Sequence, residues 1–230
     1  MLPLGHVLVD FDGTACLHDA AEHLLIEFGD PSWLEYDEAE LRGEIGSRQA
    51  IAAQAAMLRQ PFERLLSFAV DHCPLDPTFV PFVRWLESSR IPVTLVSDGF
   101  GFYIEPILRA GGAGHLPVVT NTWSPDGDAP IAFRNGHAVC IGCGTCKMNA
   151  VLRGRERGPV VFVGEGQSDR YGALYADVVF AKDTLVDIAR ADGVPFLPWE
   201  TFDDVRSALE GLDEPPGAVS PDRCPGWRTA

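Results

Sequence analysis

Two carboxylates stand two residues apart in the run DFDGT, directly after an apolar stretch near the start of the chain. Side chains at positions i and i+2 of an extended chain point to the same side, so Asp10 and Asp12 can face one ligand. Carboxylates this close raise each other's pKa unless a cation lies between them. A hard divalent ion with oxygen ligands meets that need. The pair therefore indicates a metal site, although Asp12-Gly13 also suits an ordinary turn.

A serine and a lysine could hold the oxygens of a phosphate. Ser97 follows a second apolar run and is itself followed by Asp98 and Gly99. Its hydroxyl and the N–H groups of a glycine-containing turn can donate to an anion, although the same serine also fits a plain strand–helix turn. Lys147 stands just before a helical stretch. A lone lysine is usually solvated, but a chain this acidic needs fixed positive charge wherever it binds phosphate.

Two more acids, Glu165 and Asp169, follow a third apolar run in the sequence GEGQSD. Four residues apart in a turn that opens a helix, they can converge on one cation. The dipole of a helix N-terminus also favours acids there. That alternative explains Asp169 better than it explains Glu165.

The apolar runs before these residues have the composition of buried parallel strands, because they are rich in β-branched residues and separated by helical patterns. They cover residues 7–9, 93–96, 160–163 and 178–180. Ligands bind beyond the carboxyl ends of strands in open α/β sheets. We therefore predict an α/β, Rossmann-like parallel sheet with helices on both faces and one site shared by three strand ends.

A long stretch without strand signals separates the first two strands. Helical patterns occur at residues 20–28, 32–41, 48–59 and 61–72, with Ser47 as an expected N-cap. We predict a small inserted α-helical cap at residues 17–73, and a core domain made of residues 1–16 and 74–212. Within the core, residues 121–146 predict a hairpin or loop.

The last residues, 213–230, contain four prolines, which predicts a loosely ordered tail.

The order DFDGT, strand-Ser, Lys and strand-GExxxD resembles the haloacid dehalogenase (HAD) superfamily, which carries four motifs in this order. The helical insert resembles the cap of its phosphoserine-phosphatase-like branch. The segments RGEIGSR, VSDGF and CGTCK are most similar to the methionine-salvage phosphatases, which act on 2-hydroxy-3-keto-5-methylthiopentenyl-1-phosphate.

This resemblance implies a Mg²⁺-dependent phosphatase that forms an aspartyl-phosphate on Asp10. Asp12 would be the general acid that protonates the leaving oxygen and later activates water. The phosphate-binding residues would be Ser97, Asp98, Gly99 and Lys147. The Mg²⁺ ligands would be Asp10, the backbone carbonyl of Asp12, Glu165 and Asp169, the last directly or through water.

Three residues depart from the pattern of these families. Glu165 stands where aspartate is commoner, and Asp98 replaces a more usual glycine, which adds negative charge near the phosphate. Gln54 falls about where phosphoserine phosphatases carry a carboxylate-binding arginine, which makes phosphoserine a poor candidate substrate. Asp19 stands where this branch contacts substrate, but it equally fits an exposed helix start. We expect Asp19 and Gln54 to contribute to substrate choice.

Three other functions fit the same fold. A dehalogenase needs the nucleophile but no second acid, so Asp12 argues against it. Transfer of the phosphoryl group to an acceptor other than water stays open. A catalytically silent binding protein would not need every motif residue. All of them are present here, which argues against this function.

The charge balance of the chain bears on its partners. With 18 Lys and Arg against 33 Asp and Glu, the formal net charge is −15, which argues against nucleic acid and anionic membranes as partners. The start of the chain lacks a basic leader before its acids. We expect a cytoplasmic monomer or homodimer that acts on a small phosphorylated metabolite.

A cysteine-rich run precedes Lys147. Cys140, Cys143 and Cys146 are spaced C-x₂-C-x₂-C, and with His137 they could bind zinc. The second C-x₂-C pair of structural zinc sites is missing. We favour packed or free thiols at these positions.

Overall fold

The computed structural model describes residues 3–124, 130–216, 224 and 226. Within them, six parallel strands form one sheet in the order β3-β2-β1-β6-β7-β8. These strands are β1 (His6–Val9), β2 (Val93–Val96), β3 (Val118–Val119), β6 (Val160–Gly164), β7 (Val178–Ala181) and β8 (Leu197–Pro198). The predicted α/β fold is therefore confirmed.

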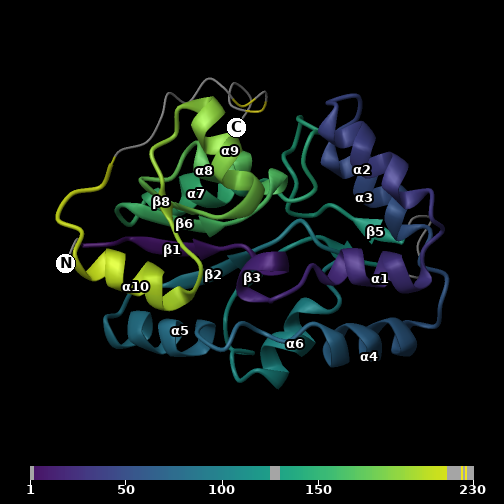
Figure 1. Ribbon diagram of the computed structural model, residues 1–230, viewed down its shortest axis with the longest axis horizontal. Coiled ribbons are helices and arrows are strands. Elements are labelled where there is room, and N and C mark those ends of the chain that lie inside the picture. Colours follow the sequence, from purple (N-terminus) through teal and green to yellow (C-terminus); the bar gives the residue numbers. More distant parts are fainter. Residues whose placement is uncertain (1–2, 125–129, 217–223, 225, 227–230) are drawn as a thin grey trace.

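Alternate side chains of the strands enter two separate cores, and helices cover both faces of the sheet (Figure 1). Val7 and Val9 point to the face covered by α5 (Phe79–Ser88), α6 (Ile104–Ala110) and α10 (Phe202–Glu210). Leu8 points to the other face, covered by α7 (Lys147–Arg155), α8 (Arg170–Ala173) and α9 (Asp183–Asp192). The central strands are buried on both faces, which is why their sequences read as continuous apolar runs.

Four helices between β1 and α5 form a group at one end of the molecule (Figure 1). They are α1 (Ala20–Phe28), α2 (Trp33–Leu41), α3 (Ser47–Ala55) and α4 (Phe62–His72). The helix expected at residues 48–59 ends at Ala55, and the expected N-cap at Ser47 is wrong, because Gly46 caps α3 in an extended conformation. That residues 17–73 form a separate cap domain remains a prediction.

The chain leaves and re-enters the sheet region through two paired segments. Cys16 and Leu75 form an isolated antiparallel bridge. The N–H of Leu17 donates to the carbonyl of Pro74 at 3.0 Å, and that of Asp76 to Ala15 at 2.9 Å. This pairing brings the start and the end of the helical group together beside the sheet.

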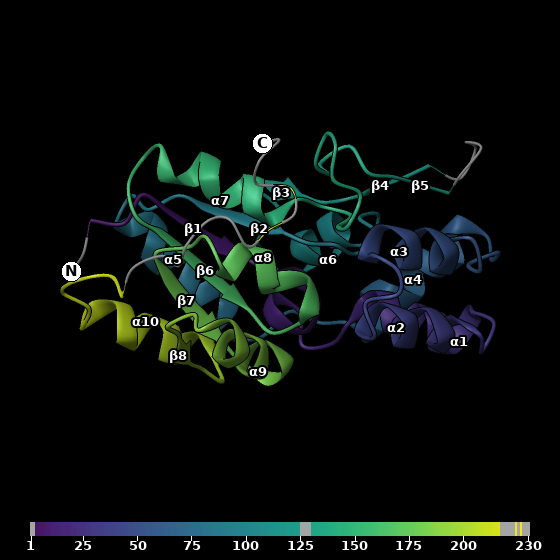
Figure 2. The same ribbon diagram turned by 90° about the horizontal axis from the view of Figure 1, so that it is seen from above.

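A second contact joins the helical group to the core. The Nε of Arg48, on α3, donates to the carbonyl of Cys143 at 3.0 Å, and its guanidinium lies 5.3 Å from the ring centre of Phe133. Figure 2 shows α3 at the edge of this group that faces the strands β4 (Thr122–Trp123) and β5 (Ile131–Ala132). These two strands pair antiparallel and form the hairpin predicted in residues 121–146.

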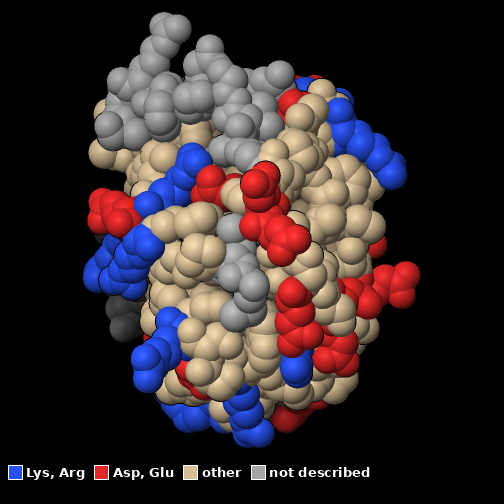
Figure 3. All heavy atoms as spheres, turned by 90° about the vertical axis from the view of Figure 1, so that its left-hand side faces the viewer, with Lys and Arg blue, Asp and Glu red and all other residues tan. Residues whose placement is uncertain are grey.

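The remaining short segments are two turns of helix, η1 (Phe11–Ala15) and η2 (Gln167–Asp169). Most of the tail predicted at 213–230 lies outside the described residues, but Cys224 is buried. None of the described helices is long and apolar enough to cross a bilayer. On the face shown in Figure 3, acidic and basic side chains both occur, so the net charge does not form one continuous acidic surface there.

We predict that Phe202→Ala destabilises the fold by about 3–5 kcal/mol, the usual cost of removing a buried phenylalanine. The Phe202 ring is fully buried against Phe79, Phe82 and Trp199, where α10 packs on α5. Chemical unfolding measures the change. Leu34→Ala, at a side chain that is 51% exposed, is the control and should cost less than about 1 kcal/mol. Equal losses in the two variants would contradict this packing.

Candidate active site

Asp10 occupies the position directly after β1. Its N–H donates to the carbonyl of Val163 at 2.9 Å, so it continues the ladder between β1 and β6. Its Oδ1 accepts from Nζ of Lys147 at 2.7 Å, and Oδ2 accepts from the Thr14 hydroxyl at 3.4 Å. Burial, with the charge of Asp169, raises the pKa of Asp10 to about 7, against the lowering effect of Lys147. Two hydrogen bonds thus hold the carboxyl in place, and its pKa lies close to neutral pH.

Asp12 lies beside Asp10 in a different environment. Its Oδ1 accepts from the N–H of Ala20 at 3.0 Å, and its Oδ2 accepts from the hydroxyls of Tyr103 at 2.9 Å and Ser97 at 3.3 Å. No cation contacts it among the described residues. Burial, followed by the charges of Asp19 and Asp10, raises the pKa of Asp12 well above its usual range. A carboxyl that keeps its proton near neutral pH can act as a general acid.

The turn after β2 places Ser97, Asp98 and Gly99 next to Asp12. The Ser97 hydroxyl accepts from the N–H of Gly99 at 2.9 Å. Asp98 turns away from this hydroxyl, and its Oδ1 accepts from the backbone N–H of Thr145. The carboxyl of Asp98 therefore ties the serine turn to the loop before Lys147 rather than hydrogen bonding within its own turn.

Asn121 supports the same turn, although its sequence position gave no sign of this role. Its Nδ2 donates to the carbonyls of Asp98 at 2.7 Å and Gly99 at 3.1 Å, and its Oδ1 accepts from Thr145 Oγ1 at 3.3 Å. Asn121 is 1% exposed. It therefore fixes the backbone on which Ser97 is held.

Lys147 begins α7 and is 1% exposed. Its Nζ donates to Asp10 Oδ1 at 2.7 Å, Asp169 Oδ1 at 2.6 Å and the Ser168 hydroxyl at 3.0 Å. Burial alone would lower the pKa of Lys147, but the charges of Asp10 and Asp169 outweigh it and raise the pKa. The lysine is thus permanently charged, and it joins the strand ends of β1 and β6.

Glu165 and Asp169 follow β6, and the structure gives them different surroundings. Asp169 uses Oδ1 for Lys147 and Oδ2 for the N–H groups of Glu165 at 2.9 Å and Gly166 at 3.0 Å. The Glu165 carboxyl accepts no hydrogen bond from the described residues, and it lies against Gly13, whose φ is +67°. Burial, with the charges of Asp10 and Asp169, raises the pKa of Glu165 to about 8. Of the two acids, only Glu165 has a carboxylate free for a further partner.

The carboxyls of Asp10, Asp12 and Glu165 share a cavity of about 150 Å³ with residues of α1 to α3. The side chains that sequence assigned to substrate choice, Asp19 and Gln54, both line it. Asp19 also caps α1 through the N–H of Glu22 at 2.9 Å, and Gln54 Nε2 donates to Asp37 at 2.5 Å. Their part in substrate choice stays a prediction.

The site fits a Mg²⁺ ion between Asp10 and Glu165. No three His, Cys, Asp or Glu side chains of the described residues are already arranged as metal ligands. Mg²⁺, however, is commonly held by one or two carboxylates, with water and substrate phosphate completing its shell. Burial and neighbouring acids raise the pKa values of Asp10 and Glu165, at Asp10 even with Lys147 beside it, and a divalent cation would offset this excess of negative charge.

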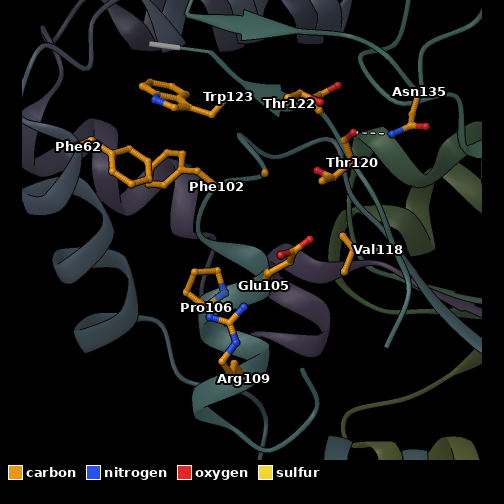
Figure 4. A pocket seen from close by; sticks show the side chains of 12 residues that line it. Phe62, Phe102, Glu105, Pro106, Arg109, Val118, Thr120, Thr122, Trp123 and Asn135 are labelled. Atoms are coloured by element: carbon orange, nitrogen blue, oxygen red, sulfur yellow. Dashed lines mark hydrogen bonds between the residues drawn. The ribbon is translucent and has the colours of Figure 1, made fainter. Parts of the chain in front are cut away.

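A second cavity, of about 540 Å³, has Asn121 among its lining residues. Figure 4 shows Phe62 from α4 beside Phe102, with Trp123 above them and Glu105 and Arg109 of α6 below. The rings of Phe62 and Phe102 have centres 5.5 Å apart. None of the motif acids lines this cavity, so it is separate from the site of the carboxylates.

The cysteines before Lys147 line a small space of about 10 Å³ together with Cys224 and His137. His137 accepts from the N–H groups of Val139 at 3.1 Å and Cys140 at 2.8 Å through Nδ1. The His137 ring therefore accepts two backbone hydrogen bonds that close a turn. Among the described residues these side chains form no group arranged to hold a metal.

The fold and the four motif positions define a class of protein. The chain belongs to the haloacid dehalogenase-like hydrolase family, whose profile matches residues 7–173. It is 26% identical over 215 residues to a 2-hydroxy-3-keto-5-methylthiopentenyl-1-phosphate phosphatase of Bacillus velezensis, covering 90% of this chain and 91% of that one. It is 27% identical to the polyol phosphate phosphatase PYP1 of Saccharomyces cerevisiae, covering 89% and 92%. The resemblance inferred from the motifs is thereby confirmed.

Solved structures agree on the fold. A substrate-bound phosphoserine phosphatase superposes with a TM-score of 0.67 at 16% identity, covering 93% of this chain and 100% of the other. A phospho-aspartyl intermediate analogue of phosphoserine phosphatase gives a TM-score of 0.66 at 15% identity, covering 90% and 98%.

We predict that Mg²⁺ binds more tightly as the pH rises, by up to about tenfold per pH unit for each ligand carboxyl that must lose a proton, because that proton competes with the metal. With the pKa of Glu165 raised to about 8, binding at pH 7 should release protons to the buffer and the gain should end above pH 8. Calorimetry in two buffers of different ionisation enthalpy measures the release. Glu165→Gln should bind more weakly and release fewer protons, whereas the exposed Glu35→Gln should match the parent. An affinity that does not vary with pH would contradict the assignment.

Proposed function

We propose that this protein is a Mg²⁺-dependent phosphatase that hydrolyses a small phosphate monoester in the cytoplasm through an aspartyl-phosphate on Asp10. The observation that carries the proposal is the contrast between two neighbouring carboxyls. Asp10 contacts the Lys147 ammonium at 2.7 Å, whereas Asp12 has only uncharged donors and a pKa well above its usual range. Asp10 is therefore suited to attack phosphorus, and Asp12 is suited to donate a proton.

In the first step, a carboxylate oxygen of Asp10 bonds to phosphorus while the ester oxygen leaves with the proton of Asp12. Ser97 and Lys147 donate to the oxygens of the transferring group. In the second step, Asp12 takes a proton from water as that water attacks phosphorus, which frees phosphate and restores Asp10. Mg²⁺, held by Asp10, Glu165 and the carbonyl of Asp12, with Asp169 direct or through water, would supply charge neutralisation. Most of the acceleration comes from positioning and electrostatics.

The relatives support this reading, since the Bacillus velezensis and yeast proteins are named as phosphatases of small phosphate esters. The neighbourhood of Asp12 weighs against a dehalogenase, which requires no such acid. A dehalogenase would not need the three hydrogen bonds of 2.9–3.3 Å that Asp12 accepts.

We predict that Asp10→Asn lowers turnover by at least about a thousandfold, about 4 kcal/mol in barrier terms. The amide preserves the shape of the side chain but lacks a nucleophilic oxygen and one charge toward the metal. Hydrolysis of p-nitrophenyl phosphate, measured once with Mg²⁺ and once with EDTA, shows how activity depends on Asp10 and on the metal. Asp30→Asn, at a surface acid, is the control. Turnover of Asp10→Asn within about tenfold of the parent would rule out Asp10 as the nucleophile.

We predict that Asp12→Asn slows phosphorylation by alkyl phosphates more than by p-nitrophenyl phosphate, because a good leaving group has little need of an acid. With the aryl ester the phosphoenzyme should then accumulate, since water has lost its base. Rapid quenching and mass spectrometry would detect one added phosphoryl group, located on Asp10 by proteolysis. Equal slowing with both esters would count against Asp12 as the acid.

A further inference from the structure

Tyr103 is a fully buried tyrosine that belongs to none of the four motifs. It stands directly before α6. Its ring packs against those of Phe11 and Phe102, with ring centres 6.1 and 5.3 Å away. A buried tyrosine hydroxyl needs a hydrogen-bond partner. Here that partner is the carboxyl of Asp12, whose Oδ2 accepts from the hydroxyl at 2.9 Å.

The backbone of the turn after β2 sets the direction of this hydrogen bond. The N–H of Phe100 donates to the Tyr103 oxygen at 3.3 Å, which leaves the tyrosine proton for Asp12. The Ser97 hydroxyl has the same arrangement, since it accepts from the N–H of Gly99 at 2.9 Å and donates to the same Oδ2 at 3.3 Å. Two adjacent N–H groups thus orient two hydroxyls toward one carboxyl oxygen.

The absence of a side chain at Gly99 leaves the space in which these groups meet. A Cβ at this position would overlap the Tyr103 hydroxyl and would lie 2.5 Å from Asp12 Oδ2, whereas ordinary contacts of a Cβ begin at 3.4 Å. Any other residue here would displace the tyrosine hydroxyl or the carboxyl. The glycine of this turn is therefore required by the contact between Tyr103 and Asp12.

The two hydroxyls differ in what else they can reach. Ser97 lines the cavity that holds the motif acids, and in the proposed mechanism it turns to the phosphate. Tyr103 does not line that cavity, so its hydroxyl stays on Asp12 when substrate binds. We propose that Tyr103 is a positioning residue that keeps the Asp12 carboxyl oriented for proton transfer while Ser97 holds phosphate. The inference rests on the proposed function and adds a residue that acts through the general acid.

The same hydrogen bonds assign the acidic proton to one oxygen of Asp12. Oδ2 accepts from two hydroxyls, which occupies both of its lone pairs. Among the described residues, Oδ1 accepts only from the N–H of Ala20, at 3.0 Å. In the free enzyme the proton therefore lies on Oδ1. In the first step the Oδ1–H bond breaks as the ester oxygen takes the proton, and the electron pair stays on the carboxylate. Tyr103 donates throughout and transfers no proton.

The variant Tyr103→Phe removes the hydroxyl and keeps the ring. We expect kcat/KM to fall at least about tenfold for 2-hydroxyethyl phosphate but less than about threefold for p-nitrophenyl phosphate, because only the alkyl ester needs a well-placed acid. The ratio of the two values is taken within one variant, so a general loss of active protein does not affect it. Tyr175→Phe alters a buried tyrosine of the other core and should leave the ratio unchanged.

A double variant shows whether Tyr103 acts through Asp12. In the Asp12→Asn background, Tyr103→Phe should change the ratio by less than about twofold, because the acid is already lost. A further change as large as that seen in the parent would mean that the tyrosine acts on another group, and it would overturn the proposal.

The contact itself can be observed by NMR without the phenylalanine variant. In protein made with isotope-labelled tyrosine, which occurs four times in the chain, one hydroxyl proton should exchange slowly with water and should change its chemical shift in Asp12→Ala. The lack of such a proton would contradict the hydrogen bond. If the parent hydrolyses both esters with Mg²⁺ and Tyr103→Phe keeps the parent's ratio, the role of Tyr103 is overturned while the phosphatase stands. An absence of Mg²⁺-dependent hydrolysis of every ester would overturn the proposed function itself.

Discussion

The buried ammonium of Lys147 is the interaction on which the arrangement of the site depends. It contacts one carboxylate from the end of β1 and one from the turn after β6, at 2.7 and 2.6 Å, with 1% of its own side chain exposed. Burying a charge is costly unless it is paired and fully hydrogen bonded. The adjacent, parallel pairing of β1 with β6 brings Asp10 and Asp169 close enough for one lysine to satisfy both. Lys147 begins α7. Its ammonium therefore links the position of this helix to the order of β1 and β6 in the sheet.

Because Lys147 donates to Asp10 and Asp169, the other acids of the site form no ion pair with a described residue. Asp169 uses both of its oxygens, whereas the Glu165 carboxyl has no donor among the described residues, and its pKa is raised by burial first and by its acidic neighbours second. A protein that is already at −15 gains nothing from such a concentration of charge unless a cation joins it. The electrostatics thus favour a cation at the phosphate end of the cavity.

The strands and motif residues could be predicted because local sequence determines them. Short β-branched runs before Asp10, Ser97 and Glu165 indicate parallel strands. The carboxyl ends of such strands lie at one edge of the sheet, so these three residues are expected to lie together. Tyr103 and Glu40 could not be found this way. The hydroxyl of Tyr103 reaches Asp12 across 91 residues of sequence, and Glu40 enters the site only because α2 packs on α3 beside the sheet. Contacts of this kind are set by tertiary packing, which leaves no periodic signal.

The departure at Asp98 illustrates how a local change acquires two consequences. A glycine there would leave the N–H of Thr145 without its acceptor and the cavity without its buried carboxyl. The aspartate uses one oxygen to fix the loop before Lys147, and its other oxygen is buried without a hydrogen-bond donor among the described residues. An asparagine could retain the first bond through its carbonyl oxygen but not the charge. The hydrogen bond and the charge of this side chain are therefore separable, because an amide supplies the first without the second.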